Sequence, residues 1–125
     1  MIVGIGVDIA EISRVDELCT RYGERFASRI LCEDELQEYR QRRNSSSYLA
    51  LRFAAKEAVA KACGTGIGAE LGFHDMQIEH DAAGKPLLRF FDSADDLLKR
   101  LQVRNALISL SDEKHYVVAM AVLES

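Results

Sequence analysis

The sequence lacks the features of a secreted, membrane-spanning or nucleic-acid-binding protein. Its three cysteines, Cys19, Cys32 and Cys63, are an odd number without CxxC or metal-ligand spacing, which favours reduced thiols and a cytoplasmic location. The N-terminus has no basic segment and its apolar run soon meets Asp8, so we expect neither a signal peptide nor a transmembrane helix. With a net charge of −4 and no Lys/Arg-rich run, no nucleic-acid partner is expected.

Repeats, low-complexity segments and linkers are also missing. A chain of 125 residues with 48% hydrophobic and 29% charged residues fits one globular domain that spans residues 1–125. The three histidines are dispersed and show no metal-ligand spacing. A zinc site or a disulfide framework is therefore not expected.

The apolar pattern predicts both helices and strands. We expect strands at 1–9, 73–79, 87–91, 105–110 and 116–123, and helices at 11–22, from about 33 to 40, at 49–63 and from Asp92 or Ser93 to Leu101. Ser13 is the expected N-cap of the first helix, and residues 41–47 an exposed connection. Residues 117–123 are apolar on both faces, which predicts a central strand or one covered by a neighbouring subunit. Helices followed mostly by hairpin strands define an α+β domain.

The segment from Arg52 to Gly68 combines an apolar helix with charged residues at regular spacing. A helix that is apolar nearly all round is usually buried, and charges on it need partners. Glu57 and Lys61 have two interpretations. They are either an i,i+4 ion pair or a metal ligand and a phosphate ligand, with the glycine loop at 64–68 beside them.

Two further features have alternative interpretations. Asp8 ends the first apolar strand, either as a cap for the next helix or as a buried carboxylate that requires a nearby cation. Arg14, Arg21 and Arg25 share one side if the helix continues past Gly23. They form either a solvated face or a local positive patch suited to an acidic partner.

Two blocks of the sequence, Gly4–Ile9 and Arg52–Ala62, resemble the two signature motifs of the holo-acyl-carrier-protein synthase family. This family is the small class of 4′-phosphopantetheinyl transferases. The likeness continues through Gly64–Gly68, the Gly84-Lys85-Pro86 turn and the final strands at 108–111 and 115–119. It therefore spans nearly the whole chain, with the motifs in the same order.

The resemblance implies an α+β domain whose antiparallel strands pack against a long central helix. It implies transfer of the phosphopantetheine arm of coenzyme A to a serine of apo-acyl carrier protein, with release of adenosine 3′,5′-bisphosphate, in fatty-acid biosynthesis. It further implies Mg²⁺ held by Asp8 and Glu57 as catalytic residues, which fits the preference of Mg²⁺ for few carboxylates together with water and phosphate oxygens. It implies Lys61 as the third catalytic residue, which neutralises charge on the leaving group. It also implies a homotrimer with active sites between subunits.

Further residues are assigned by the same resemblance. Coenzyme A contacts are expected at Arg52 and Arg43, at Lys61, at the backbone of Gly64, Thr65 and Gly66, and at Pro86 of an adjacent subunit. The acidic acyl carrier protein is expected to meet Arg14, Arg21 and Arg25.

One position departs from the family. Many members have a histidine where this chain has Asp112, so a phosphate contact by that histidine is not expected here. The general base stays open between a metal-bound water, Glu35 and Asp8. The alternative function is a non-catalytic coenzyme A or nucleotide-binding module on the same scaffold, and a third possibility is a structural oligomerisation domain.

Overall fold

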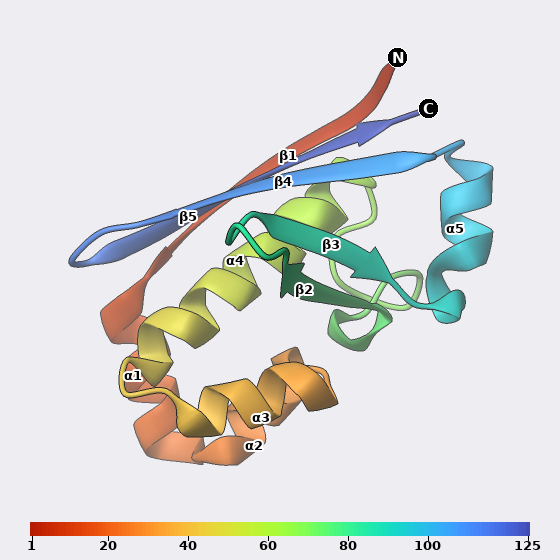
Figure 1. Ribbon diagram of the computed structural model, residues 1–125. Helices are drawn as coiled ribbons and strands as arrows, with labels where there is room; N and C mark the ends of the chain where they lie inside the picture. Colours follow the sequence, from red (N-terminus) through yellow and green to blue (C-terminus); the bar gives the residue numbers. More distant parts are fainter.

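The computed structural model describes all residues from Met1 to Ser125 and shows an α+β fold, as predicted (Figure 1). The helices are α1 (Ile12–Tyr22), α2 (Glu24–Ile30), α3 (Glu33–Gln41), α4 (Ser45–Ala62) and α5 (Asp95–Arg100), with 3₁₀ turns η1 (Phe73–Asp75) and η2 (Asp92–Ala94). The strands are β1 (Ile2–Glu11), β2 (Met76–His80), β3 (Pro86–Phe90), β4 (Asn105–Asp112) and β5 (Tyr116–Glu124). None of the helices combines the length and apolarity needed to cross a bilayer.

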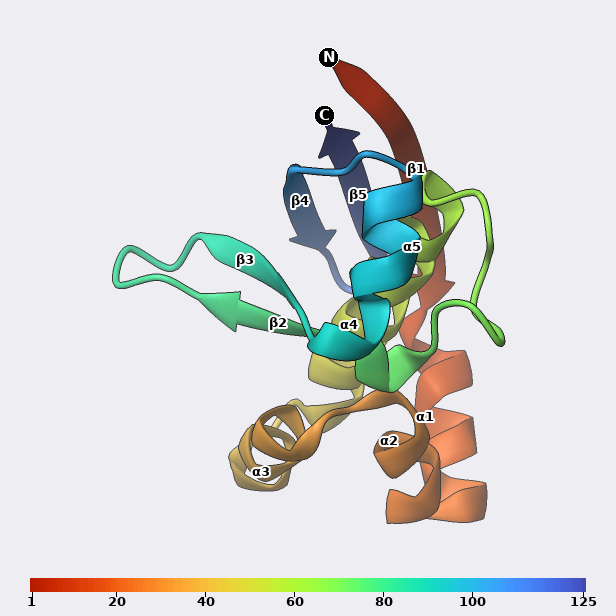
Figure 2. The ribbon, with the colours of Figure 1, turned by 90° about the vertical axis from the view of Figure 1, so that its right-hand side faces the viewer.

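Two antiparallel sheets are present. The first has the order β1-β5-β4, so β5 is the central strand that its two apolar faces predict. The second is the β2-β3 hairpin, which extends away from the body of the molecule (Figure 2). In the larger sheet Asp8 of β1 pairs with Ala119 of β5. One face of this sheet packs on α4. The helices α1, α2 and α3 surround one end of α4 (Figures 1 and 2).

Close contact between β1 and α4 depends on glycine. A Cβ atom at Gly4 would lie 2.1 Å from the carbonyl oxygen of Ala62, and one at Gly6 would lie 2.0 Å from that of Ala58. Both distances are steric clashes, so only glycine lets the strand backbone lie directly on the helix. Because side chains alternate along a strand, Asp8 faces the same way as the two glycines and is directed towards α4.

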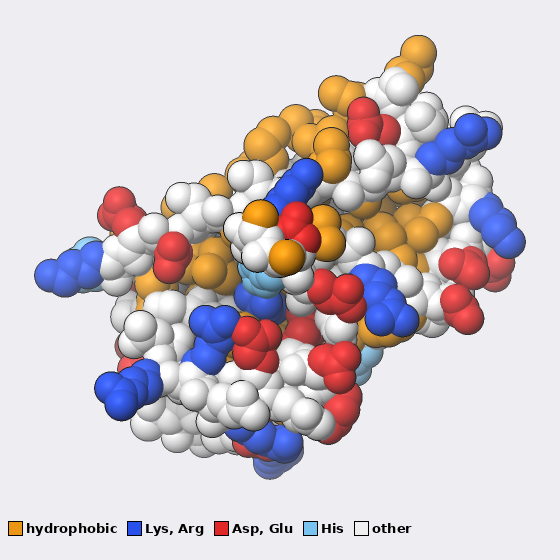
Figure 3. Space-filling model, viewed as in Figure 1, with side chains coloured by type: hydrophobic (Ala, Val, Ile, Leu, Met, Phe, Trp, Pro, Cys, Tyr) orange, Lys and Arg blue, Asp and Glu red, His pale blue; other side chains and the backbone are white.

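The other face of the larger sheet is apolar yet exposed. Its side chains come from all three strands: Ile5, Val7, Ile9, Leu107, Tyr116, Val118 and Met120. Hydrophobic side chains gather along the strands in the upper part of the space-filling view (Figure 3). Monomeric soluble proteins rarely expose an apolar surface of this kind, which is typical of an interface.

Several element boundaries differ from the predictions. The first helix ends at Tyr22, as predicted, but α2 follows after Gly23 as a separate helix that was not predicted, so Arg25 does not share a helix with Arg14 and Arg21. Glu11 is the N-cap of α1, without a side-chain capping bond, and Ser13 instead donates its hydroxyl to the Glu11 carboxylate at 2.5 Å. The three serines predicted to be a connection form the first turn of α4, because the Tyr48 N–H already donates to the Asn44 carbonyl at 3.1 Å. Residues 73–75, predicted as the start of a strand, form η1.

Candidate active site

Asp8 of β1 and Lys61 of α4 meet where the strand lies against the helix. The Lys61 ammonium donates to Asp8 Oδ1 at 3.0 Å and to the Val7 carbonyl at 3.0 Å. The Lys61 side chain is 51% exposed and that of Asp8 17% exposed. The partner of Lys61 is therefore Asp8 on the strand, and the alternative of an ordinary Glu57–Lys61 ion pair is wrong.

Glu57 lies one turn before Lys61 on α4 and has no hydrogen bond or ion pair within the chain. Burial and the nearby Asp8 carboxylate raise the pKa of Glu57, while Lys61 acts in the opposite direction. Two carboxylates that repel each other at a partly solvated site fit a divalent cation. Mg²⁺ prefers a site that has few protein carboxylates and leaves room for water and phosphate oxygens. No three His, Cys, Asp or Glu side chains form a cluster for a more enclosed metal site.

Asp8 and Glu57 line one cleft of about 520 Å³ between β1, α1, α2 and α4. Arg14 of α1 lines the same cleft and contributes a positively charged side chain to it. Two aromatic side chains, Phe26 of α2 and Phe53 of α4, form apolar walls. The cleft thus combines an acidic pair, a basic group and an apolar lining, which suits a ligand with both charged and apolar parts.

The other two predicted partner-binding arginines lie on neighbouring surfaces. Arg25 lines a cleft of about 830 Å³ between α1 and α2, which shares Leu18 and Phe26 with the first cleft. Arg21 is exposed and lies over the ring of Tyr22, at 5.9 Å from its centre. Arg14 and Arg25 therefore line adjoining clefts, and Arg21 is exposed two turns after Arg14 on α1.

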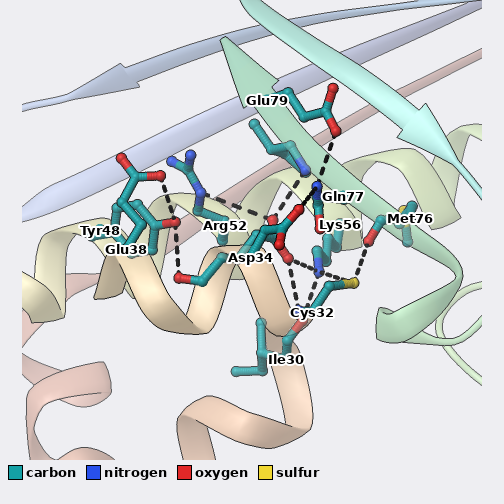
Figure 4. A network of polar contacts seen from close by, with 12 residues as sticks. Ile30, Cys32, Asp34, Glu38, Tyr48, Arg52, Lys56, Met76, Gln77 and Glu79 are labelled. Atoms are coloured by element: carbon teal, nitrogen blue, oxygen red, sulfur yellow. Dashed lines mark hydrogen bonds and ion pairs between the residues drawn. The ribbon is translucent and has the colours of Figure 1, made fainter. Parts of the chain in front are cut away.

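A second charged cluster lies on the buried side of α4 (Figure 4). Lys56 is completely buried and donates to Glu35 Oε1 at 2.6 Å, to the Ile30 carbonyl at 2.7 Å and to the Phe73 carbonyl at 3.0 Å. Glu35, only 2% exposed, also accepts from the backbone N–H groups of Cys32 and Ile78. With these partners Glu35 has a structural role, and because it does not line the cleft of Asp8 and Glu57 it is not placed to act as the general base.

Arg52 belongs to this buried side and not to the cleft of Glu57. Its side chain is 4% exposed, its Nε lies 3.9 Å from Glu35 Oε2, and its guanidinium stacks on the Tyr48 ring at 4.0 Å. Nε and Nη2 are buried without a hydrogen-bond partner. Buried donors are nearly always paired, so these two nitrogens leave capacity for an anion.

The glycine loop after α4 uses its N–H groups internally. Gly64 N–H donates to the Lys61 carbonyl at 2.9 Å, and Thr65 and Gly66 donate to the Ala60 carbonyl at 3.3 and 3.1 Å. These bonds close the C-terminus of the helix. The expectation that the same N–H groups hold an anion is therefore wrong, because each already has an acceptor.

Three other predicted positions lie apart from the cleft within one chain. Arg43 is exposed just before α4 and lines a polar cleft of about 420 Å³ with Lys114 and His115. Pro86 begins β3 on the projecting hairpin, paired with His80. Asp112, at the family's usual histidine position, ends β4 and is exposed.

The thiols give no sign of chemistry. Burial raises the pKa of Cys32 to about 11 and also raises that of Cys63, so neither is ionised near neutral pH. Cys63 is therefore a packing residue.

The sequence reasoning did not single out Phe26, Phe53 or Lys56. For Lys56 the available signal was a lysine on an apolar helix without an oppositely charged partner at helical spacing.

This fold and cleft define a 4′-phosphopantetheinyl transferase-like protein. The family model for ACPS, the 4′-phosphopantetheinyl transferase superfamily, matches residues 4–121. The chain therefore belongs to this superfamily.

Within this superfamily, the individual proteins that the chain matches are holo-[acyl-carrier-protein] synthases. The chain is 52% identical to the holo-[acyl-carrier-protein] synthase of Shewanella frigidimarina over 99% of this chain and 98% of the relative. The crystal structure of the Neisseria meningitidis holo-[acyl-carrier-protein] synthase matches with a TM-score of 0.95 and 42% identity, over 100% of both chains. The Bacillus anthracis synthase, solved in complex with CoA (3′,5′-ADP), matches with a TM-score of 0.84 and 38% identity, over 100% of this chain and 98% of that one.

Proposed function

We propose that this protein is a Mg²⁺-dependent holo-acyl-carrier-protein synthase. It transfers 4′-phosphopantetheine from coenzyme A to a serine of apo-acyl carrier protein, in the cytoplasm and for fatty-acid biosynthesis. The serine oxygen forms a new bond to the phosphorus that bears pantetheine. The bond from that phosphorus to the bridging oxygen breaks, adenosine 3′,5′-bisphosphate leaves, and the serine proton is lost. The observation that carries the proposal is the meeting of Asp8, Glu57 and Arg14 in one cleft, with Lys61 bonded to Asp8.

Asp8 and Glu57 would hold the metal. When bound, Mg²⁺ offsets negative charge on the pyrophosphate of coenzyme A. Burial chiefly, and the nearby Asp8 carboxylate in addition, raise the pKa of Glu57, and a bound cation would relieve the repulsion between the two carboxylates. Lys61 is half-exposed and one turn away, so its ammonium can reach the phosphate of the leaving group. Phosphoryl transfer depends chiefly on such positioning and charge neutralisation.

The carrier protein would approach from the side of α1 and α2. Arg14 lines the cleft itself, and Arg25 lines the adjoining one. Acidic surfaces on the carrier would meet Arg14, Arg21 and Arg25 at this rim, which favours rapid encounter. The serine could then enter between the Phe26 and Phe53 walls towards Asp8 and Glu57.

Coenzyme A would extend from the metal across a subunit boundary. Within one chain Arg52, Arg43 and Pro86 lie away from the cleft, so a complete site requires residues of a neighbouring copy. Nη2 of Arg52, which has neither a hydrogen bond nor an ion pair within the chain, supports a role in binding a phosphate of coenzyme A. Thr65, Gly64 and Gly66 would contribute through the shape of the loop beside Lys61 and not through their N–H groups.

The apolar face of the β1-β5-β4 sheet supports a homotrimer. Ile5, Val7 and Val118 are exposed at its centre, and burying them against copies of the same chain removes that surface from water. Replacing Val118 with glutamate should give monomers in light scattering and abolish transfer. A trimeric Val118→Glu variant with full activity would contradict this assembly.

The test of the proposed reaction is the intact mass of an apo-acyl carrier protein after incubation with this protein and coenzyme A. One sample contains Mg²⁺ and a parallel sample contains EDTA. A gain of one phosphopantetheine group in the Mg²⁺ sample alone supports the proposal. Coenzyme A binding without any gain would favour the binding-module alternative, and the absence of both would favour a structural oligomerisation domain.

A further inference from the structure

Lys56 connects three segments that are distant in the sequence. All three hydrogens of its ammonium have an oxygen acceptor: Glu35 at the start of α3, Ile30 at the end of α2 and Phe73 in η1. Its side chain is completely buried, so no solvent competes for these bonds. Lys56 is therefore a three-way link between α4 and the segments packed around it.

Two of these links lead to the walls of the active-site cleft. Ile30 ends α2, one helical turn after Phe26, which forms one wall. The ring of Phe73 lies against that of Phe53, with 5.8 Å between ring centres, and Phe53 forms the other wall. The ammonium of Lys56 therefore holds the end of α2, one turn from Phe26, and the backbone of Phe73, whose ring packs against Phe53.

We propose that Lys56 is a positioning residue for the transfer reaction, which sets the spacing of the Phe26 and Phe53 walls and thereby seats the serine segment of the carrier protein. The inference rests on the proposed function. Lys56 makes no hydrogen bond or ion pair with Asp8, Glu57 or Lys61. Its loss should therefore weaken productive binding of the carrier protein and leave binding of coenzyme A and Mg²⁺ intact.

The test uses a variant that removes the link and the Glu35 charge together. Lys56→Met alone would leave Glu35 with only the longer Arg52 contact at 3.9 Å, whereas Lys56→Met/Glu35→Gln removes one charge of each sign and keeps one oxygen that can accept from the N–H of Cys32 or of Ile78. We expect the KM for apo-carrier protein to rise about tenfold, since a small misplacement of a reacting group is costly. The affinity for coenzyme A with Mg²⁺, measured by calorimetry, should stay within about twofold.

Two further variants separate positioning from general destabilisation. Leu97→Ala removes a buried side chain on α5, away from the cleft, and should lower the melting temperature without raising the KM for the carrier. Phe73→Leu keeps the carbonyl that Lys56 binds but removes the ring beside Phe53, and should raise this KM about threefold. It tests the same wall should the double variant fail to fold.

The outcomes distinguish the inference from the proposed function. An active wild type whose carrier KM rises in the double variant or in Phe73→Leu, but not in Leu97→Ala, supports the positioning role. An active wild type with unchanged KM in both variants overturns it, and so does an equal rise in Leu97→Ala. A wild type that transfers no phosphopantetheine overturns the proposed function itself, and the positioning role with it.

Discussion

The two charged clusters of α4 differ in how far the protein itself satisfies them. On the buried face, Lys56 has three oxygen acceptors and Glu35 accepts from Lys56 and from two backbone N–H groups. On the half-exposed face, Lys61 bonds to Asp8 and Val7, while Glu57 has no partner and a raised pKa. The same residue types are thus structural where the protein satisfies them, and in our proposal they form a binding site where capacity remains.

The largest effect should follow from removing a carboxylate of the unsaturated cluster. Asp8→Asn should lower the rate of phosphopantetheine transfer about 10³-fold, because a metal-centred interaction supplies several kcal/mol of transition-state stabilisation. The rate is measured from the mass of the carrier protein over time, at saturating Mg²⁺. A variant that retains a tenth of the wild-type rate would show that Asp8 is not a metal ligand for catalysis.

Removing the lysine from the buried cluster should chiefly lower stability, whereas removing the lysine from the half-exposed cluster should chiefly slow transfer. Lys56→Met should lower the free energy of unfolding by about 3–5 kcal/mol, because the buried Glu35 carboxylate loses its closest cation and keeps only the longer Arg52 contact at 3.9 Å. Lys61→Met should lower it by less than about 1 kcal/mol, since its ion pair is partly exposed, yet slow transfer strongly. Urea titrations of both variants provide the measurement. Equal losses of stability would remove the distinction between the clusters.

The basic rim of the cleft should contribute through the carrier protein. Arg14→Glu should raise the KM for apo-carrier protein about tenfold and weaken its dependence on salt, because a favourable charge contact becomes repulsive. Steady-state rates at two ionic strengths provide the comparison. Arg104→Glu is the control, since this exposed arginine lies in a separate cleft beside Ser125. An unchanged KM for Arg14→Glu would leave this arginine as an ordinary solvated residue.

The smallest expected effect is a gain in stability. Because the pKa of Glu57 is raised above its ordinary value of 4.5, the folded state binds more protons than the unfolded state between the two pKa values. Stability of the wild type therefore falls as the pH rises through that window. Without metal, Glu57→Gln should melt about 2 °C higher than the wild type above this window and at the same temperature below it. A difference of the opposite sign would contradict the proposed carboxylate repulsion.

Part of the half-exposed cluster of α4 could be predicted from the sequence. Glu57 and Lys61 share a helical face and Asp8 interrupts an apolar strand, so local pattern singles these residues out, but their roles as metal ligands and catalytic lysine follow only from the family resemblance. The contact between Asp8 and Lys61 depends on the close approach of β1 to α4 at Gly4 and Gly6. Glycines in an apolar strand predict such an approach but not which element lies opposite, so the pairing is visible only in the fold.

The buried cluster was beyond local sequence reasoning. Lys56 and Glu35 are 21 positions apart, and α3 and α4 must pack before the pair exists. Arg52 was expected at a phosphate, and its burial against Tyr48 follows from the same packing. The bonds from Gly64, Thr65 and Gly66 to α4 carbonyls likewise depend on how the helix ends.

The most direct test of the account compares the wild type with Glu57→Gln in a single-turnover transfer assay. Both proteins are first shown to be folded by their melting temperatures, and Mg²⁺ and coenzyme A are saturating. The account predicts that the wild type adds phosphopantetheine to the carrier protein and that Glu57→Gln, equally stable or more so, does so at less than about one-hundredth of that rate. Transfer by Glu57→Gln at a near wild-type rate would contradict it, because the chemistry would then lie outside the unsaturated cluster of α4.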